Sequence, residues 1–282
     1  MTEVNGRTHH YNAEATALSG HLRLPLDQLI KPQSHAILSP EGGYLSQRVG
    51  EYRIESVLAF RSAYTQVAGN RSTKPAQGWS TLVTTAIEGL NVLDIVTADR
   101  IVGQTILEHP LEGYIPAISF LGTRFENLRI AGHPVDVDLD LGFVGTKPAN
   151  DAIYTRDASL VARVMSQLNR IGERHDLPPD LRERYNRLSS ALGTPQEEIE
   201  CSLVNRVTGA YPGLSFGHVI TVPDFGTITL GKVNLKHEDY TTEAGVHKKT
   251  TVRLTMIDLH MGCLADGDVP VGTGSANGTT SP

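Results

Sequence analysis

A glycine-flanked serine is the part of this sequence that comes nearest to a catalytic motif. Gly213-Leu214-Ser215-Phe216-Gly217 matches the nucleophile-elbow string, in which a strained turn between a strand and a helix raises the serine hydroxyl. The stretch HVITV, which begins at His218, has the β-branched composition of a strand and not of a helix. We therefore expect a turn that leads into a strand, and Ser215 and His218 remain candidates for an alternative, hydrolase-like hypothesis.

The chain contains eleven histidines, which invites the hypothesis of a metal or acid–base site. None of them falls in the HExxH or Cys/His spacings that hold zinc. His237 and His260 complete the set of catalytic candidates, because strand positions far apart in the sequence could still converge in space. His9 and His10 lie in a segment, residues 1–12, that we expect to be flexible. The favoured interpretation is a set of unrelated histidines at surfaces and interfaces.

Three aspartates alternate with apolar residues in the stretch HPVDVDLDLG. In a strand, Asp136, Asp138 and Asp140 would share one face at intervals of about 7 Å. Their repulsion would need screening by water, by cations on a neighbouring strand or by Ca²⁺. We favour a solvated outer face, with the three aspartates as candidate Ca²⁺ ligands, and we expect no other cofactor.

Composition and charge exclude several classes of function. The 282 residues are 39% hydrophobic, enough for a large core, and the net charge of -6 argues against nucleic-acid binding, which requires clustered Lys and Arg. No apolar run is long enough for a membrane span or a signal peptide, which predicts a cytoplasmic protein by default. Cys201 and Cys263 could form one bridge, although two buried thiols are the favoured interpretation.

Hydrophobic periodicity predicts a mainly β protein with one helical insertion. Residues 1–150 form a β region, in which we expect three short strands over 79–109. Residues 151–200 have helical spacing and predict two helices, the first capped by Asp157 or Ser159. Residues 201–270 predict the closing strands of the same domain, and 271–282 a flexible tail. The expected fold is therefore an antiparallel β-sandwich or barrel with a helical hairpin insertion.

The closing strands resemble a known family. GTITLGKVNLK, TVRLTMIDLHMGC and DVPVGTGSANG are similar to the closing segment of the choice-of-anchor P family, and residues 88–105 and 125–137 fit the same style. The resemblance implies an all-β module of the bacterial envelope or cell surface and brings no catalytic residues. The chain departs from that pattern in having no visible export signal or anchor and in its helical insertion.

Two classes of function follow from these patterns. The preferred hypothesis is a non-enzymatic structural or interaction protein that forms a homo-oligomer or self-assembles. It rests on long, weakly charged strands such as Thr81–Ile87 and Thr251–Met261, whose edges must be paired by a partner or closed. The alternative is a β-barrel enzyme or small-molecule binder with a site in a cavity.

Overall fold

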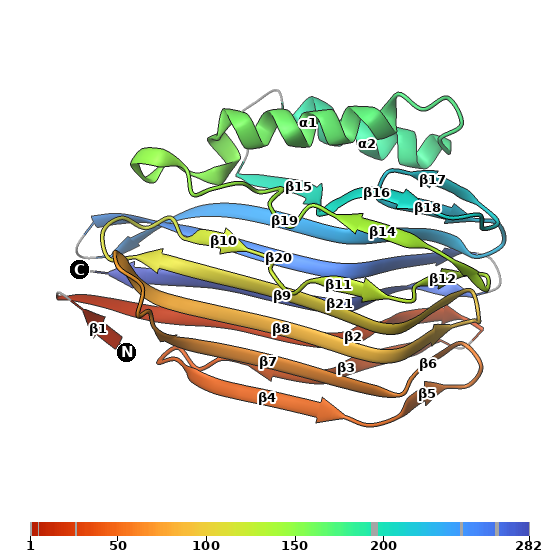
Figure 1. The fold of residues 1–282 in the computed structure, drawn as a ribbon, viewed down its shortest axis with the longest axis horizontal. Coiled ribbons are helices and arrows are strands. Elements are labelled where there is room, and N and C mark those ends of the chain that lie inside the picture. Colours follow the sequence, from red (N-terminus) through yellow and green to blue (C-terminus); the bar gives the residue numbers. More distant parts are fainter. Residues whose placement is uncertain are drawn as a thin grey trace.

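Long antiparallel strands dominate the chain, and Figure 1 shows them stacked in two layers with a pair of helices along one edge. The computed structural model describes residues 2–4, 6–25, 27–192, 197–242, 245–262 and 265–281. Every strand pair is antiparallel, as the turn-rich sequence between the β-branched segments requires.

The first layer, sheet A, contains nine strands. They are β1 (Thr2–Val4), β2 (Arg7–Leu24), β3 (Gln28–Ile37), β15 (Glu198–Ser202), β17 (Leu214–Phe216), β18 (Val219–Val222), β19 (Gly226–Thr242), β20 (Gly245–Gly262) and β21 (Asp266–Ser281). Their order is β1-β2-β21-β20-β19-β18-β17, with β3 also paired to β2 and β15 to β19. The centre of sheet A is thus built from the two ends of the chain.

The second layer, sheet B, comes from the first half of the chain. Its strands are β4 (Gly43–Val49), β5 (Tyr52–Ile54), β6 (Leu58–Phe60), β7 (Ser62–Arg71), β8 (Gln77–Val92), β9 (Val96–Pro110), β10 (Ala117–Ser119), β11 (Arg124–Glu126), β12 (Arg129–Ile130) and β13 (His133–Pro134). Both sheets end in edge strands, so they form a sandwich and not a closed barrel. A two-stranded ribbon, β14 (Asp136–Leu139) and β16 (Val204–Thr208), lies beside them.

The helical insertion closes one edge of the sandwich. Two short turns, η1 (Ala149–Asp151) and η2 (Tyr154–Arg156), precede α1 (Ala158–Gly172) and α2 (Pro179–Ala191). The Asp157 side chain caps α1 by accepting a hydrogen bond from the Leu160 N–H at 3.0 Å. Gln167 of α1 ties the helix to β15, because its amide group bonds both the N–H and the carbonyl of Ser202. The predicted mainly β fold with a helical hairpin is confirmed.

Three expectations about individual segments are wrong. Residues 271–282 are not a flexible tail, since β21 runs to Ser281 in the middle of sheet A between β2 and β20. Residues 1–12 are not a loose entry either, because β2 starts at Arg7. The segment 79–109 forms two long strands, β8 and β9, instead of three short ones.

The two strands whose edges suggested a partner are paired within the chain. Thr81–Ile87 belongs to β8, which lies between β7 and β9, and Thr251–Met261 belongs to β20, which lies between β19 and β21. These segments are weakly charged because they are central strands with one face in the core, and neither offers a free edge.

A line of reversal crosses sheet A and interrupts the alternation of its strands. Along this line two consecutive residues of each strand are buried, namely Ala17 and Leu18, Leu230 and Gly231, Met256 and Ile257, and Val271 and Gly272. Cross-strand register aligns the four pairs in one row. Gly231 (φ 59°) and Gly272 (φ 65°) adopt the left-handed conformation that glycine reaches without a steric penalty. In each of these strands, the alternate set of residues that faces the core before this line therefore faces solvent after it.

Candidate functional site

The serine motif does not build a nucleophile elbow. Ser215 lies in the short strand β17, which turns directly into β18, so no helix follows the serine. Its hydroxyl lies 3.5 Å from the carbonyl oxygen of Gly217. His218 is buried and its Nε2 pairs with the hydroxyl of Tyr185 at 3.1 Å. Burial, with the nearby Arg184 and Lys232 charges, lowers the pKa of His218 to about 3. His218 is therefore not placed to activate this serine as a base.

The remaining histidine candidates lie at opposite ends of sheet A. His237 pairs with Asp239 at 3.1 Å and lines a depression beside η2, whereas His260 lies on β20 opposite Thr227. Ten residues of β19 separate the two positions, or about 33 Å along the strand. The four catalytic candidates do not converge on one site.

The aspartate row has the solvated form that was favoured. Asp136, Asp138 and Asp140 are exposed and alternate with half-buried residues. Asp138 accepts a hydrogen bond from Asn205 at 2.8 Å, and Asp140 accepts one from the Gly142 N–H at 3.0 Å. Within the described part of the chain, no three His, Cys, Asp or Glu side chains gather closely enough to hold a metal ion. The row therefore behaves as an outer face and not as a built Ca²⁺ site.

A polar groove on the outer face of sheet A is the most developed candidate site. It has a volume of about 670 Å³ and draws side chains from five strands and the β3 edge. The lining residues are Glu14, Thr16, Ser19, Pro32, Glu198, Lys232, Asn234, Lys236, Thr251, Arg253, Thr255, Asp258, Pro270, Thr273 and Ser275. None is aromatic, and thirteen of the fifteen are polar or charged. None of the candidates from the sequence lies in this groove.

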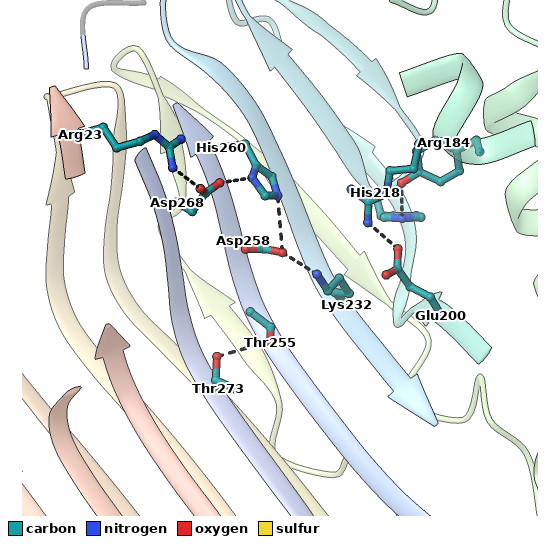
Figure 2. A network of polar contacts seen from close by, with 11 residues as sticks. Arg23, Arg184, Glu200, His218, Lys232, Thr255, Asp258, His260, Asp268 and Thr273 are labelled. Carbon is teal, nitrogen blue, oxygen red and sulfur yellow. Dashed lines mark hydrogen bonds and ion pairs between the residues drawn. The ribbon is translucent and has the colours of Figure 1, made fainter. Parts of the chain in front are cut away.

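A network of charged side chains extends from the groove to Arg23 on β2 (Figure 2). Inside the groove, Lys232 donates to Asp258 at 2.5 Å. His260 lies between two carboxylates, with Nδ1 2.5 Å from Asp268 and Nε2 3.8 Å from Asp258. Arg23 completes this network by donating a hydrogen bond to Asp268 at 2.8 Å. Partial burial works to raise the pKa of Asp268, but its bonds to Arg23 and His260 outweigh this effect and lower that pKa.

The line of reversal makes this arrangement possible. Thr255 and Asp258 are three positions apart on β20, so regular alternation would point one of them into the core. Because the alternation reverses at Met256 and Ile257, both line the groove. The same reversal brings Asp258 within reach of Lys232, which lies opposite Thr255 in the register. The sequence shows the polar residues, but a simple period of two assigns Asp258 to the wrong face.

A second surface feature is an apolar edge formed by the end of β2 with β3 and β4. Five of the eight exposed large hydrophobic residues in the described ranges lie along this edge: Leu24, Leu29, Ile37, Tyr44 and Leu45. Leu29 is 69% exposed and Tyr44 62% exposed. β3 and β4 are edge strands, each paired on one side only in its sheet. We call this surface the β3–β4 edge.

Buried histidines form a third cluster, inside the sandwich. His9 stacks on Trp79 with ring centroids 5.0 Å apart, and the His109 ring lies 4.5 Å from His9. His9 Nδ1 bonds the Thr280 hydroxyl at 2.8 Å, while His9 Nε2 and both nitrogens of His109 have no hydrogen-bond partner among the described atoms. The expectation that His9 lies in a mobile tail is wrong, because β2 carries it into the core.

Of the two cysteines, the structure describes Cys201. Cys201 is a buried free thiol on β15, and burial raises its pKa to about 12. Cys263 lies outside the described residues. Cys201 therefore matches the favoured interpretation of a buried thiol in the core.

The comparisons with known proteins give a family. Residues 9–236 match the family described as Domain of unknown function (DUF8256), and this range is more than half of the 282 residues. The chain belongs to this family. No curated protein and no solved structure matches the chain. The match spans β2 to the middle of β19, so it includes the β3–β4 edge and the helical insertion, while β20 and β21 of the groove lie beyond it.

Of the helices in the described ranges, none has the length and apolar character to cross a membrane.

Proposed function

We propose that this protein is a non-enzymatic interaction protein that binds a polar ligand in the groove of sheet A. The observation that supports the proposal is the groove itself, whose volume of about 670 Å³ lies within the ~300–1,000 Å³ range of ligand sites. Its lining is polar and well anchored on the central strands of the sheet. A rigid sheet face holds its side chains at fixed spacing, which favours recognition of a ligand by hydrogen bonds.

The arrangement of the candidate residues argues for binding without catalysis. His237, Asp136 and Asp140 line three different depressions, and none of these is the groove. Inside the groove, Lys232 and Asp258 are held by each other, so neither is a free general base or nucleophile. An enzymatic function stays the alternative hypothesis, with the weaker support.

A matched pair of blocking substitutions tests the proposal. Ser275→Tyr places a bulky side chain on the groove floor, and Ser80→Tyr places the same side chain on the outward face of β8 in sheet B. Thermal-shift and calorimetric titrations would use a panel of sugars, sugar acids and amino acids. We expect at least one compound to bind the wild type and the Ser80→Tyr protein but not Ser275→Tyr. Equal binding to all three proteins would reject the groove as the site.

A second candidate function, self-association, is favoured by the β3–β4 edge. Exposed edge strands with apolar side chains pair readily with a second chain, and natural sheets usually protect such edges with charges. Envelope association, implied by the resemblance to choice-of-anchor P domains, stays a prediction. Sedimentation of the wild type and of Leu29→Glu measures the association, with Leu121→Glu, also exposed at 63%, as the control. A wild type that stays monomeric at high concentration would remove this candidate.

A further inference from the structure

Arg253 is the groove cation whose charge has no partner among the residues that the structure describes. The other two cations of the lining are paired, Lys232 with Asp258 at 2.5 Å and Lys236 with Glu238 at 2.8 Å. The side chain of Arg253 makes no hydrogen bond or ion pair with any other residue in the described ranges, and it is exposed on β20. A guanidinium that is held on a central strand and left unpaired is well suited to bind an anion through two parallel hydrogen bonds.

The direct neighbours of Arg253 in the register are an amide and a hydroxyl. The register places Asn234 and Ser275 directly beside it on β19 and β21. One row further, Thr255 and Thr273 lie opposite each other with their hydroxyls 3.4 Å apart (Figure 2). Thr16 continues that row on β2. Hydroxyl groups both donate and accept hydrogen bonds, so this floor suits a ligand with several hydroxyls.

The lining also limits how a ligand could gain affinity. With no aromatic side chain in the groove and only two prolines as apolar residues, neither ring stacking nor burial of apolar area contributes much. Charge-assisted hydrogen bonds are about twice as strong as neutral ones, so most of the affinity must come from an ion pair. Arg253 is the group that offers such a bond.

The acidic residues of the groove set the charge of the ligand. Glu14, Glu198 and Asp258 balance the three basic residues, so the lining as a whole is neutral. A phosphate dianion would concentrate two negative charges beside these carboxylates, whereas an elongated ligand carries its carboxylates spread along the groove. From Thr251 to Asp258 the groove runs along β20 for about 23 Å, which fits an elongated ligand.

We propose that the ligand of the groove is a hydroxylated carboxylate of the sugar-acid type, with its carboxylate bound to Arg253 and its hydroxyls bound to the threonine row. This inference rests on the proposed function of the groove. It adds the charge and class of the ligand and names the residue that selects it.

The test compares two ligands that differ in charge. Trigalacturonate carries carboxylates, and its methyl ester is a neutral molecule of the same shape. Calorimetric titration of the full chain should give binding of trigalacturonate at least tenfold tighter than of the ester, a difference of about 1.4 kcal/mol. Raising the salt from 50 to 300 mM should weaken the binding of the acid more than that of the ester.

Three variants locate the interaction. Arg253→Gln should weaken trigalacturonate binding at least tenfold and leave the affinity for the ester unchanged. Arg253→Lys should restore part of the affinity for trigalacturonate, because lysine keeps the positive charge but lacks the two parallel N–H donors of the guanidinium. Arg53→Gln, at an exposed position of β5 in sheet B, is the matched control and should bind as the wild type does. Circular dichroism confirms that each variant is folded.

Each result separates this inference from the function on which it rests. If the ester binds as tightly as the acid and Ser275→Tyr abolishes both, the groove is a binding site but the role of Arg253 is wrong. If orthophosphate binds in competition with trigalacturonate at similar affinity, the site is a general anion site and the inference is overturned. If neither sugar binds, the ligand class is wrong, and the wider panel then decides whether the groove binds any ligand.

Discussion

Acid should destabilise this protein through histidines that are held neutral in its core. Burial, together with the charge of Lys147, lowers the pKa of His109 from its ordinary 6.5 to about 3. Burial likewise lowers the pKa of His9 to about 2, with smaller effects of His109, His10 and Arg7. The unfolded chain takes up a proton below pH 6.5, and the folded chain does not. The stabilising effect of neutral histidine is therefore complete above pH 6.5 and is lost as the pH falls towards 3.

The size of the effect follows from linkage. Between pH 7.5 and 5.0 each such histidine lowers the free energy of unfolding by about 2 kcal/mol, since one pH unit below 6.5 corresponds to about 1.36 kcal/mol. His218, also buried, has its pKa lowered to about 3 and adds a third contribution. The three together amount to about 6 kcal/mol, a large part of the ~5–15 kcal/mol that stabilises a typical domain.

Urea unfolding at both pH values measures this loss. Trp79, the single tryptophan, is fully buried against His9 and reports unfolding by fluorescence, and circular dichroism provides an independent signal. His109→Phe should reduce the loss between pH 7.5 and 5.0 by about 2 kcal/mol. His175→Gln, at an exposed position after α1, should leave it unchanged. The reasoning is refuted if His109→Phe loses as much stability on acidification as the wild type.

Three further perturbations address the features that shape the groove and the insertion. Gly272→Ala should lower the free energy of unfolding by about 1–2 kcal/mol, because its φ of 65° is left-handed and the added Cβ would lie 3.2 Å from Met256; urea titration measures it. Lys232→Met should cost about 2 kcal/mol, because it removes the lysine that pairs with the buried carboxylate of Asp258. Asp258→Asn in the same chain should recover most of the loss. Asp157→Ala should cost about 1 kcal/mol and speed hydrogen exchange in the first turn of α1, and unchanged exchange there would contradict the cap.

The helical insertion and the aspartate row show how far periodicity alone can predict the structure. Leu160, Val164, Leu168 and Ile171 repeat at helical spacing, and all four are buried on one side of α1. Asp136 and Asp138 alternate with Val137 and Leu139 and face solvent, because a half-buried strand needs only that pattern. Such local patterns depend on neighbours along the chain, so the sequence contains all the information that they require.

The last strand shows where composition misleads. VGTGSANGTTS is small and polar, which predicts a loose tail, yet β21 occupies the centre of sheet A. Small residues are needed there because the opposite sheet comes close. A Cβ on Gly274 would lie 2.7 Å from Val83, and one on Gly278 would lie 2.9 Å from His109, both on the opposite sheet. Only the packing of the two layers distinguishes this strand from a flexible tail.

The sequence by itself determined the β-rich composition, the helical hairpin and the solvated faces, because each depends on the spacing of residues within one segment. The tertiary structure decided the groove, the pairing of Lys232 with Asp258, the isolation of Arg253 and the burial of His9 and His109. These features arise from strands that meet from both ends of the chain and reverse their alternation along a common line. Cross-strand register is a property of the whole sheet, so no single segment of sequence specifies it.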